Sequence, residues 1–360
     1  MTRRLTAKLY RYGSDITAPI GNANSTWTER RGVLLRIEGD QGRRAYGEAS
    51  PLPGYSSDSL EDCVRALEHW IERVPEPEST VDTVNNVEWT LGQLEKASEN
   101  IPVELPAARC AVQVAMWSWL AQRQGLSPAD LLNPSPQAEV PLTRWVTGQN
   151  EKDWLHSARQ ALASGYQSLK FKCGPDNLDP LLSTLSQLRA EFGIGISLRL
   201  DANRSLAPDA FDDNASAWKD LGIDFLEEPF GVPNVRVELP TAWDESLRDQ
   251  TATELANTPT GTIPAALVIK PMVLGGITAS VAYARAARAI RAEPIVSHCL
   301  GGPVDMAACC ELACALQTQG VPAGLDHHDA LETWLPLRLS PSAGTVWQHS
   351  TAAWPVENLP

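Results

Sequence analysis

The order of apolar and polar residues divides the chain into two parts with different predicted elements. In the first part, residues 3–12 and 32–38 alternate apolar and polar side chains, which predicts two strands. A Pro/Gly/Ser-rich turn over residues 49–59 is followed by SLEDCVRALEHWIERV, an amphipathic helix that opens with a capping serine. A second helix is predicted over 107–124. Strands followed by helices are typical of an α+β unit.

From about residue 139 the pattern changes to strands that alternate with helices. Helices are predicted over 153–164, 178–192, 277–292 and 303–317. Apolar strands are predicted over 141–148, 167–174, 196–203, 223–230, 240–245, 265–271, 294–299 and 321–326. Eight short apolar strands in one run indicate parallel strands that are covered on both faces. The natural closure is a (β/α)8-type barrel.

These patterns predict an α/β protein with two domains. Residues 1–108 form an α+β capping domain, and residues 109–326 form the catalytic barrel. The tail over about 327–360 contains four prolines and three tryptophans, and we expect it to pack back on the capping domain and complete it. The 360 residues suffice for a barrel of roughly 250 residues and a smaller partner domain.

Composition excludes several classes of partner. The net charge is −14 and no basic run stands out, which argues against nucleic acid. No apolar run reaches the roughly 18 residues that a membrane span needs, and no signal peptide is recognisable at the start. The seven cysteines include no zinc-like CxxC pair, so free thiols in a reducing cytoplasm are expected. A small-molecule substrate remains, bound by a monomer or a homo-oligomer.

Charged side chains end five consecutive predicted barrel strands. In chain order these strand ends carry Lys170 and Lys172, Asp201 and Asn203, Glu227 and Glu228, Asp244 and Glu245, and Lys270. Catalytic residues of such barrels lie at the carboxyl ends of the strands. Charged residues rarely end buried strands without a partner or a metal. The strand ends therefore predict an active site.

Three acids in this series suit a divalent cation. Asp201, Glu227 and Asp244 would converge from three neighbouring strands, and water or substrate would complete an octahedral Mg²⁺ site. The set contains no nitrogen or sulfur ligand, which disfavours zinc. A ring of ion pairs with the lysines is the alternative for these acids.

The lysines are candidates for proton transfer. Lys170 and Lys172 are two residues apart on a strand, so both point to one face, and Lys270 would face them from four strands further round. Burial near like charge and a metal is expected to lower a lysine pKa and to provide a neutral base. A cation and an ammonium near a substrate carboxylate would stabilise the enediolate that forms when its α-proton is removed. For a lone KxK pair, a solvated strand edge is the alternative.

These residues resemble the enolase superfamily and, within it, the muconate-lactonising subgroup. The marks are KxK on strand two, D-x-N on three, E-E-P on four, DES on five and a lysine on six. Within the subgroup, YGEASPLPGYSSDSLED over 46–62 is similar to the capping segment of the o-succinylbenzoate synthase family. The resemblance implies an enolase-like fold and covers nearly the whole chain.

The resemblance also implies ligand and support roles. Asp201, Glu227 and Asp244 would bind Mg²⁺, with Mn²⁺ as a possible substitute, and Glu227 rather than Glu228 would be the ligand. Asn203 and Arg199 would support the ligand shell.

The lysines receive roles from the same resemblance. Lys172 would remove the α-proton and then protonate the departing hydroxyl. Lys170 would hold the substrate carboxylate and lower the pKa of Lys172, and Lys270 would stabilise the enediolate from the far face. The reaction implied is the syn dehydration of 2-succinyl-6-hydroxy-2,4-cyclohexadiene-1-carboxylate to 2-succinylbenzoate, a lyase step of menaquinone or phylloquinone synthesis.

The chain departs from the family after strand seven. Where these synthases often carry serines for the succinyl carboxylate, the chain reads Ser297-His298-Cys299-Leu300-Gly301-Gly302. Backbone N–H groups of Gly301 and Gly302, before a helix, are the predicted substitute, together with Ser297. Packing or substrate contact is the role expected for His298. The DHHD run over 326–329 is either a polar cluster or a metal site.

Three rival functions remain open. A racemase of N-acylamino acids or a dipeptide epimerase would use Lys172 and Lys270 as paired acid–base catalysts. A Schiff-base aldolase would use Lys270 as its nucleophile. A barrel that serves only as a binding scaffold would have ion pairs in place of the metal. Residues 19–28, between the first two strands, are the predicted lid.

Overall fold

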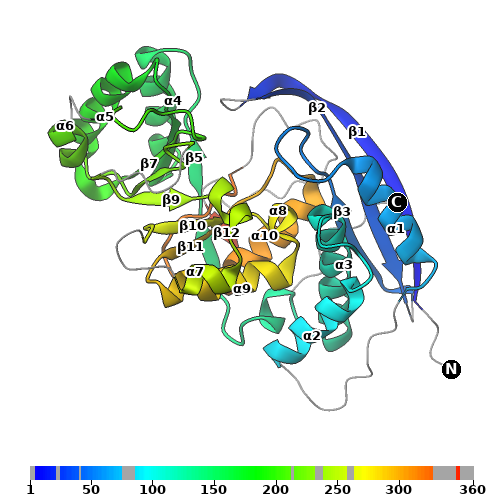
Figure 1. The fold of residues 1–360 in the computed structure, drawn as a ribbon. Helices are drawn as coiled ribbons and strands as arrows, with labels where there is room; N and C mark the ends of the chain where they lie inside the picture. The colour runs from blue at the N-terminus through cyan, green and yellow to red at the C-terminus, as the bar shows by residue number, and fades with distance from the viewer. Residues whose placement is uncertain are drawn as a thin grey trace.

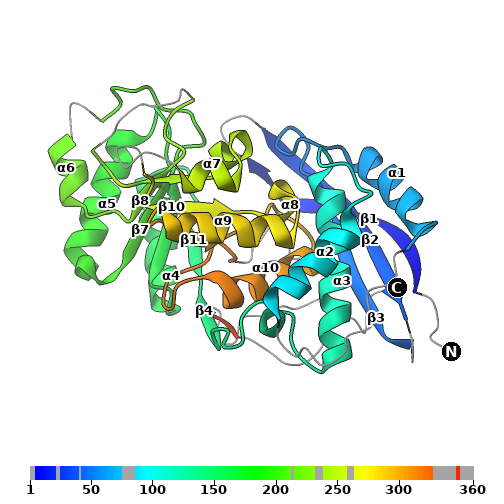
Figure 2. The ribbon, with the colours of Figure 1, turned by 60° about the horizontal axis from the view of Figure 1, so that its bottom comes forward.

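The computed structural model describes residues 5–21, 25–39, 42–74, 86–211, 215–231, 238–257, 263–326 and 346–348. Within these residues an N-terminal sheet with its helices lies beside a barrel, and the two parts are seen side by side in both ribbon views (Figures 1 and 2). The predicted α/β architecture, a barrel with an N-terminal capping domain, is confirmed.

The capping domain is built on a three-stranded antiparallel sheet. A long hairpin joins β1 (Thr6–Gly21) to β2 (Thr26–Glu38), and β3 (Arg44–Ala49) pairs with β2. The patterns over 3–12 and 32–38 therefore marked only parts of longer strands, and β3 was missed. The predicted helix after the Pro/Gly/Ser turn is α1 (Leu60–Ile71), whose first turn is capped by the Ser59 side chain.

Two further helices connect the sheet to the barrel. Helix α2 (Val87–Ser98) was missed, whereas α3 (Pro106–Gln124) confirms the helix predicted over 107–124. Helix α3 lies directly against β3, because a Cβ at Gly47 would stand only 1.7 Å from the Ala111 carbonyl oxygen. Only glycine permits this approach. The domain boundary predicted after residue 108 falls inside α3.

The barrel strands lie in sequence order within one parallel sheet. The strands are β5 (Thr143–Trp145), β6 (Ser168–Lys172), β7 (Ser197–Asp201), β8 (Phe225–Glu227), β9 (Thr241–Trp243), β10 (Ala266–Ile269) and β11 (Glu293–Val296). The predicted eighth strand closes this sheet by isolated bridges. Ala323 exchanges hydrogen bonds with the backbone beside β5, and the Gly324 N–H donates to the Val296 carbonyl at 2.9 Å.

The four helices predicted for the barrel are all present, and three further short α-helices among the described residues were not predicted. They are α4 (Glu151–Ala163), α5 (Leu178–Phe192), α6 (Ala215–Asp220), α7 (Ala252–Ala256), α8 (Pro271–Leu274), α9 (Ile277–Ala289) and α10 (Pro303–Leu316). The helices described between β7 and β10 are short: α6, α7 and the 3-10 helix Glu245–Asp249.

The tail is described only at β12 (Val346–Gln348). This strand pairs antiparallel with β4 (Glu139–Pro141), the segment that leads from α3 into the barrel. The rest of the tail, with His327, His328 and Asp329 of the DHHD run, lies outside the described residues.

Two further observations bear on composition. All seven cysteines are buried and form no disulfide, as predicted. In the described part of the chain, every helix is too short or too polar to cross a membrane.

Candidate active site

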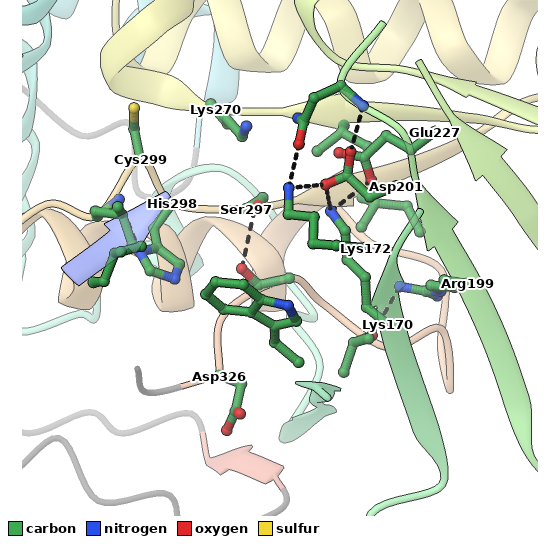
Figure 3. Close-up of a pocket in the computed structure, with 18 of the residues that line it drawn as sticks. Lys170, Lys172, Arg199, Asp201, Glu227, Lys270, Ser297, His298, Cys299 and Asp326 are labelled. Carbon is green, nitrogen blue, oxygen red and sulfur yellow. Dashed lines mark hydrogen bonds and ion pairs between the residues drawn. The ribbon is translucent and has the colours of Figure 1, made fainter. Parts of the chain in front are cut away.

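The charged strand ends lie at one level of the barrel. In the parallel ladders Lys172 is opposite Asp201, and Asp201 is opposite Glu227. Asp244 follows β9 directly, and Lys270 follows β10. Figure 3 shows Lys170, Lys172, Asp201, Glu227 and Lys270 around one pocket, which all five of them line. Asp201, Glu227 and the three lysines thus line one pocket, whereas Asp244 is not among its lining residues, and the role of the set stays a prediction.

Two of the acids share one lysine. The Lys170 Nζ atom lies 2.8 Å from Asp201 Oδ2 and 2.8 Å from Glu227 Oε2. Lys172 Nζ lies 2.7 Å from the same Asp201 oxygen and donates to the Asn203 side-chain oxygen at 2.5 Å. Asp201 and Glu227 are buried, at 3% and 2% exposure. The strand-two lysines thus neutralise the acids of strands three and four.

The third acid, Asp244, is paired with the lysine of the neighbouring strand and also contacts the capping domain. Lys270 forms a short ion pair with Asp244, and its Nζ donates to the Tyr55 hydroxyl at 2.8 Å. The Tyr55 hydroxyl in turn lies 3.1 Å from both Asp244 oxygens. Its ring centre is 4.8 Å from Lys270 Nζ, a cation–π distance. Tyr55 lies in the Pro/Gly/Ser-rich turn over residues 49–59, and its contacts with Lys270 and Asp244 were not predicted from the sequence.

Burial and neighbouring charge shift the pKa values of these acids in opposite directions. Burial would raise the pKa of Asp201, but the Lys170 and Lys172 ammonium groups lower it below its ordinary range. Burial, followed by repulsion from Asp201, raises the pKa of Glu227 to about 8. Asp201 and Asp244 both contribute to this rise, so both acids are close enough to Glu227 to interact with it electrostatically.

The predicted lowering of a lysine pKa needs a correction for Lys170. Burial acts to lower the pKa of Lys170, but attraction to Asp201 and Glu227 outweighs it and raises the pKa. For Lys270, burial also acts to lower the pKa, but attraction to Asp244 outweighs it and the pKa is raised. In the KxK pair the pKa of Lys170 is therefore raised and not lowered, because its ammonium lies beside two acids, and Lys270 behaves in the same way beside Asp244.

The acids suit a hard divalent cation by their chemistry. All three donors are carboxylates, and Glu227 Oε1 is buried without a hydrogen-bond partner among the described residues. Within that same part of the chain, however, no group of three His, Cys, Asp or Glu side chains is placed so that it could hold a metal ion. Each acid is held instead by a lysine. Asp201, Glu227 and Asp244 thus fit a metal by donor type and by an unused buried oxygen.

The second glutamate of the E-E-P motif points elsewhere. Glu228, whose φ is +42°, accepts the Asp244 and Ser246 N–H groups at 2.7 Å each and pairs with Arg204 at 2.9 Å. Its carboxylate therefore holds the strand-five end in place. Glu227, which lines the pocket, remains the candidate ligand.

A fourth acid, Glu245, was named at the end of strand five but was given no role from the sequence. Glu245 is buried, accepts from the Asn203 amide at 3.2 Å, and leaves its Oε2 atom without a partner in the described structure. Burial, followed by repulsion from Asp244, raises the pKa of Glu245 to about 7. The DES motif was its only signal. The Asn203 side chain bonds to both Glu245 and Lys172, as expected for a residue that supports the site.

Arg199 lies one layer below the acids, beside Lys170 in the ladder. Its Nη1 atom donates to the Thr143 hydroxyl at 2.9 Å and to the Pro322 carbonyl at 2.8 Å. These contacts join the first, third and eighth strands. These hydrogen bonds brace the closure of the barrel, and Arg199 also lines the pocket, so its support of the ligand shell stays a prediction.

The Gly pair after strand seven does not bind substrate in the predicted way. Gly302 N–H donates to the Glu48 carboxylate at 2.5 Å, and both Gly301 and Gly302 are buried away from the pocket lining. This corrects the prediction that their N–H groups receive a substrate carboxylate, because the protein's own carboxylate already occupies the start of α10. Glu48 gave no sequence signal except the GE-x-SPLPG run.

The remaining strand-seven residues do line the pocket. Ser297 donates to the Gly324 carbonyl at 3.0 Å, and His298 Nδ1 accepts the Leu300 N–H at 3.1 Å. This contact places the proton of a neutral His298 on Nε2. Asp326 lines the opposite wall and accepts hydrogen bonds from Arg144 and Tyr166. The described part of the DHHD run is thus paired with side chains.

The pocket combines a charged floor with an apolar upper wall. Counted with its open mouth, it holds about 1200 Å³ of empty space. The capping domain supplies Ile20, Gly21, Trp27, Leu52 and Tyr55. The two ends of the predicted lid therefore meet the pocket, while residues 22–24 lie outside the described residues.

Comparison with known proteins agrees with this geometry. Residues 153–349 match the family described as Enolase C-terminal domain-like, and residues 4–96 match the MenC, N-terminal domain. The chain is 26% identical to an o-succinylbenzoate synthase of Proteus mirabilis, over 95% of this chain and 99% of the relative. It is 25% identical to an L-Ala-D/L-Glu epimerase of Bacillus subtilis, over 83% and 81%.

Solved structures show the same fold. A dipeptide epimerase of Enterococcus faecalis, complexed with Mg and a dipeptide, superposes with a TM-score of 0.81 at 21% identity, covering 98% of this chain and 99% of that one. The first of the two family matches spans more than half of the chain. The chain therefore belongs to the Enolase C-terminal domain-like family, and it is an enzyme of the enolase superfamily.

Proposed function

We propose that this protein is a Mg²⁺-dependent o-succinylbenzoate synthase. It would convert 2-succinyl-6-hydroxy-2,4-cyclohexadiene-1-carboxylate to 2-succinylbenzoate by syn elimination of water. The observation that carries the proposal is the placement of two amines around three acids. Lys172 ends β6 and Lys270 follows β10, four strands apart in a closed eight-stranded barrel, so they face each other across the pocket.

The proton transfers are assigned to Lys172. As a neutral amine it takes the proton α to the substrate carboxylate, and the electron pair of the broken C–H bond moves into an enediolate. The ammonium so formed then donates the proton to the departing hydroxyl on the same face, and water leaves. One lysine serves both steps because syn elimination keeps the two groups on one side of the ring.

The other groups stabilise the charge that develops on the carboxylate. Lys270, held as an ammonium by Asp244 and Tyr55, faces the enediolate from the far side. Lys170 lies beside the acids and orients the substrate carboxylate. Mg²⁺, held by Asp201, Glu227 and Asp244, would supply the divalent charge that makes the α-proton more acidic.

The N-terminal match favours this reaction over others of the superfamily. Residues 4–96 match the MenC, N-terminal domain, and this region supplies the cap side of the pocket through Trp27, Leu52 and Tyr55. The Proteus mirabilis synthase aligns over nearly its full length. The residues of the pocket wall select the substrate, so a capping domain that matches the MenC, N-terminal domain supports the proposed synthase substrate.

A second candidate is racemisation or epimerisation of N-acylamino acids or dipeptides. The same opposed pair, Lys172 and Lys270, could remove a proton on one face and return one on the other. The Bacillus subtilis relative is an epimerase. The Schiff-base aldolase is disfavoured, because Lys270 is held as an ammonium by its ion pair with Asp244.

A direct assay tests the proposal. Purified protein with Mg²⁺ is expected to form succinylbenzoate, followed by its absorbance, and to lose this activity in EDTA. N-succinylamino acids and dipeptides are assayed in parallel for loss of optical rotation. Racemisation that greatly outpaces dehydration would replace the first function by the second. Ligand binding that is unchanged in EDTA, without turnover of any of these substrates, would indicate a binding scaffold.

A further inference from the structure

A buried glutamate of the capping domain holds the first turn of α10. Glu48 is the residue before the last of β3, and its carboxylate accepts the N–H groups of Gly302 at 2.5 Å, Val304 at 3.2 Å and Asp305 at 3.2 Å. It is only 1% exposed. These N–H groups have no partner inside the helix, and the helix dipole favours a negative charge there. The capping domain thus supplies the N-terminal cap of a barrel helix.

The approach of Glu48 depends on a glycine. A Cβ at Gly302 would stand 2.7 Å and 2.8 Å from the two Glu48 carboxylate oxygens. Any side chain at position 302 would push the carboxylate away. On the cap side the same carboxylate is oriented by the Tyr12 hydroxyl at 2.6 Å and the Ser50 hydroxyl at 2.8 Å.

A buried arginine makes a second connection at the same place. Arg30 of β2 is 1% exposed, and its guanidinium donates to the Leu300 carbonyl at 2.8 Å. It also donates to the carbonyls of Pro51 at 3.2 Å and Ser50 at 2.5 Å. One side chain therefore ties the start of the Pro/Gly/Ser turn to the loop after strand seven.

Both connected segments form walls of the pocket. Residues 297–300 line it from the barrel, and Leu52 and Tyr55 line it from the cap. Glu48 and Arg30 touch neither the acids nor the lysines in the contacts described above. We propose that Glu48 and Arg30 are positioning residues that set substrate affinity by holding the strand-seven loop against the cap. This inference rests on the proposed function, because the substrate wall is defined for that reaction.

The proposal makes a distinct kinetic prediction. Displacement of a wall weakens the binding of substrate and transition state alike, which raises KM and leaves kcat little changed. The proton-transfer residues lie on other strands, so their geometry is kept. A role limited to folding would instead lower the melting temperature and leave both kinetic constants of the folded enzyme unchanged.

Two variants break the same contact from opposite sides. Glu48→Gln removes the charge at nearly constant volume, and Gly302→Ala displaces the carboxylate by its Cβ. Each is expected to raise KM about tenfold while kcat changes less than about threefold. Because both act on one contact, the double variant is expected to raise KM no more than about either single one. The matched control is Glu311→Gln, a buried glutamate on α10 that accepts the Ala129 N–H at 3.1 Å away from the pocket.

Hydrogen exchange of the amides over 297–305 gives a readout independent of turnover. Exchange is expected to accelerate in Glu48→Gln and Gly302→Ala and to stay at the wild-type rate in Glu311→Gln. Unchanged exchange, an unchanged KM in an active enzyme, or fully additive effects of the two variants would overturn the proposal. Absence of succinylbenzoate formation by the wild type would instead overturn the proposed function, and the exchange data would still decide whether the contact holds the loop.

Discussion

The Tyr55 hydroxyl accepts a hydrogen bond from Lys270 Nζ at 2.8 Å, and the Tyr55 ring lies beneath the same ammonium at 4.8 Å. A capping-domain side chain thereby fixes a barrel lysine by two different interactions. In the proposed reaction a cation would draw on the charge of Asp244, and the contacts with Tyr55 would then keep Lys270 directed at the substrate.

Replacement of Tyr55 by phenylalanine tests this relationship. Tyr55→Phe keeps the ring and removes the hydroxyl, so we expect kcat to fall about tenfold with KM nearly constant, the mark of an interaction used mainly in the transition state. Steady-state kinetics of succinylbenzoate formation measure the effect, and circular dichroism checks the fold. A Tyr55→Phe enzyme with wild-type kcat would show that the hydroxyl has no part in positioning Lys270.

Removal of the proposed base is expected to have the largest effect. Lys172→Ala leaves no group to take the α-proton, and general acid–base catalysis is typically worth about 10²- to 10⁴-fold. We expect kcat to fall by about 10³-fold or more while the unfolding transition stays cooperative. Retention of most of the turnover would mean that another residue is the base.

Metal binding is expected to stabilise the fold as well as to permit catalysis. Mg²⁺ at about 100 times its dissociation constant would add about 2.7 kcal/mol to the free energy of unfolding, because it binds the folded state. Thermal denaturation with and without Mg²⁺ measures this effect. Asp201→Asn is expected to abolish both the stabilisation and the activity. Equal stabilisation of wild type and variant would place the ion elsewhere.

The buried pair Asp305 and Glu48 predicts a dependence of stability on pH. Burial, followed by repulsion from Glu48, raises the pKa of Asp305 from 3.8 to about 8. Between these values the folded protein keeps a proton that the unfolded chain has lost, so this group makes stability fall as pH rises, at most by about 1.4 kcal/mol per pH unit. Above about pH 8 the fall ends.

Asp305→Asn removes this titration and isolates it from the other acids. Urea unfolding of wild type and variant at several pH values between 5 and 8.5 gives the difference in free energy of unfolding. We expect the variant to gain relative to the wild type as pH rises. A difference that stays constant over this range would show that Asp305 is not protonated in the folded state.

Sequence patterns predicted the barrel well and the cap less well. The eight strand regions could be recognised because parallel strands covered on both faces are uniformly apolar, and each charged strand end stood out against that background. Strand β3 and helix α2 were missed. Helix α2 buries three polar residues, Thr90, Gln93 and Ser98, beside its apolar ones, so its pattern is weak.

The failures at the site have a common cause. Gly301 and Gly302 were expected to bind substrate because a helix start attracts anions, and that reasoning identified the right property. It could not identify the anion, since Glu48 lies 254 residues away in the chain. Arg199 was likewise placed on the correct strand, but its contacts with Thr143 and Pro322 depend on barrel closure.

By itself the sequence determined which chemical groups the barrel offers and that they come from successive strand ends, because residue type and the two-residue repeat of a strand are local properties. Only the tertiary structure decided which groups meet. The pairing of Lys170 with two acids, of Tyr55 with Lys270, and of Glu48 with Gly302 each depends on how strands and domains pack. Such contacts join distant segments, and no spacing along the chain encodes them.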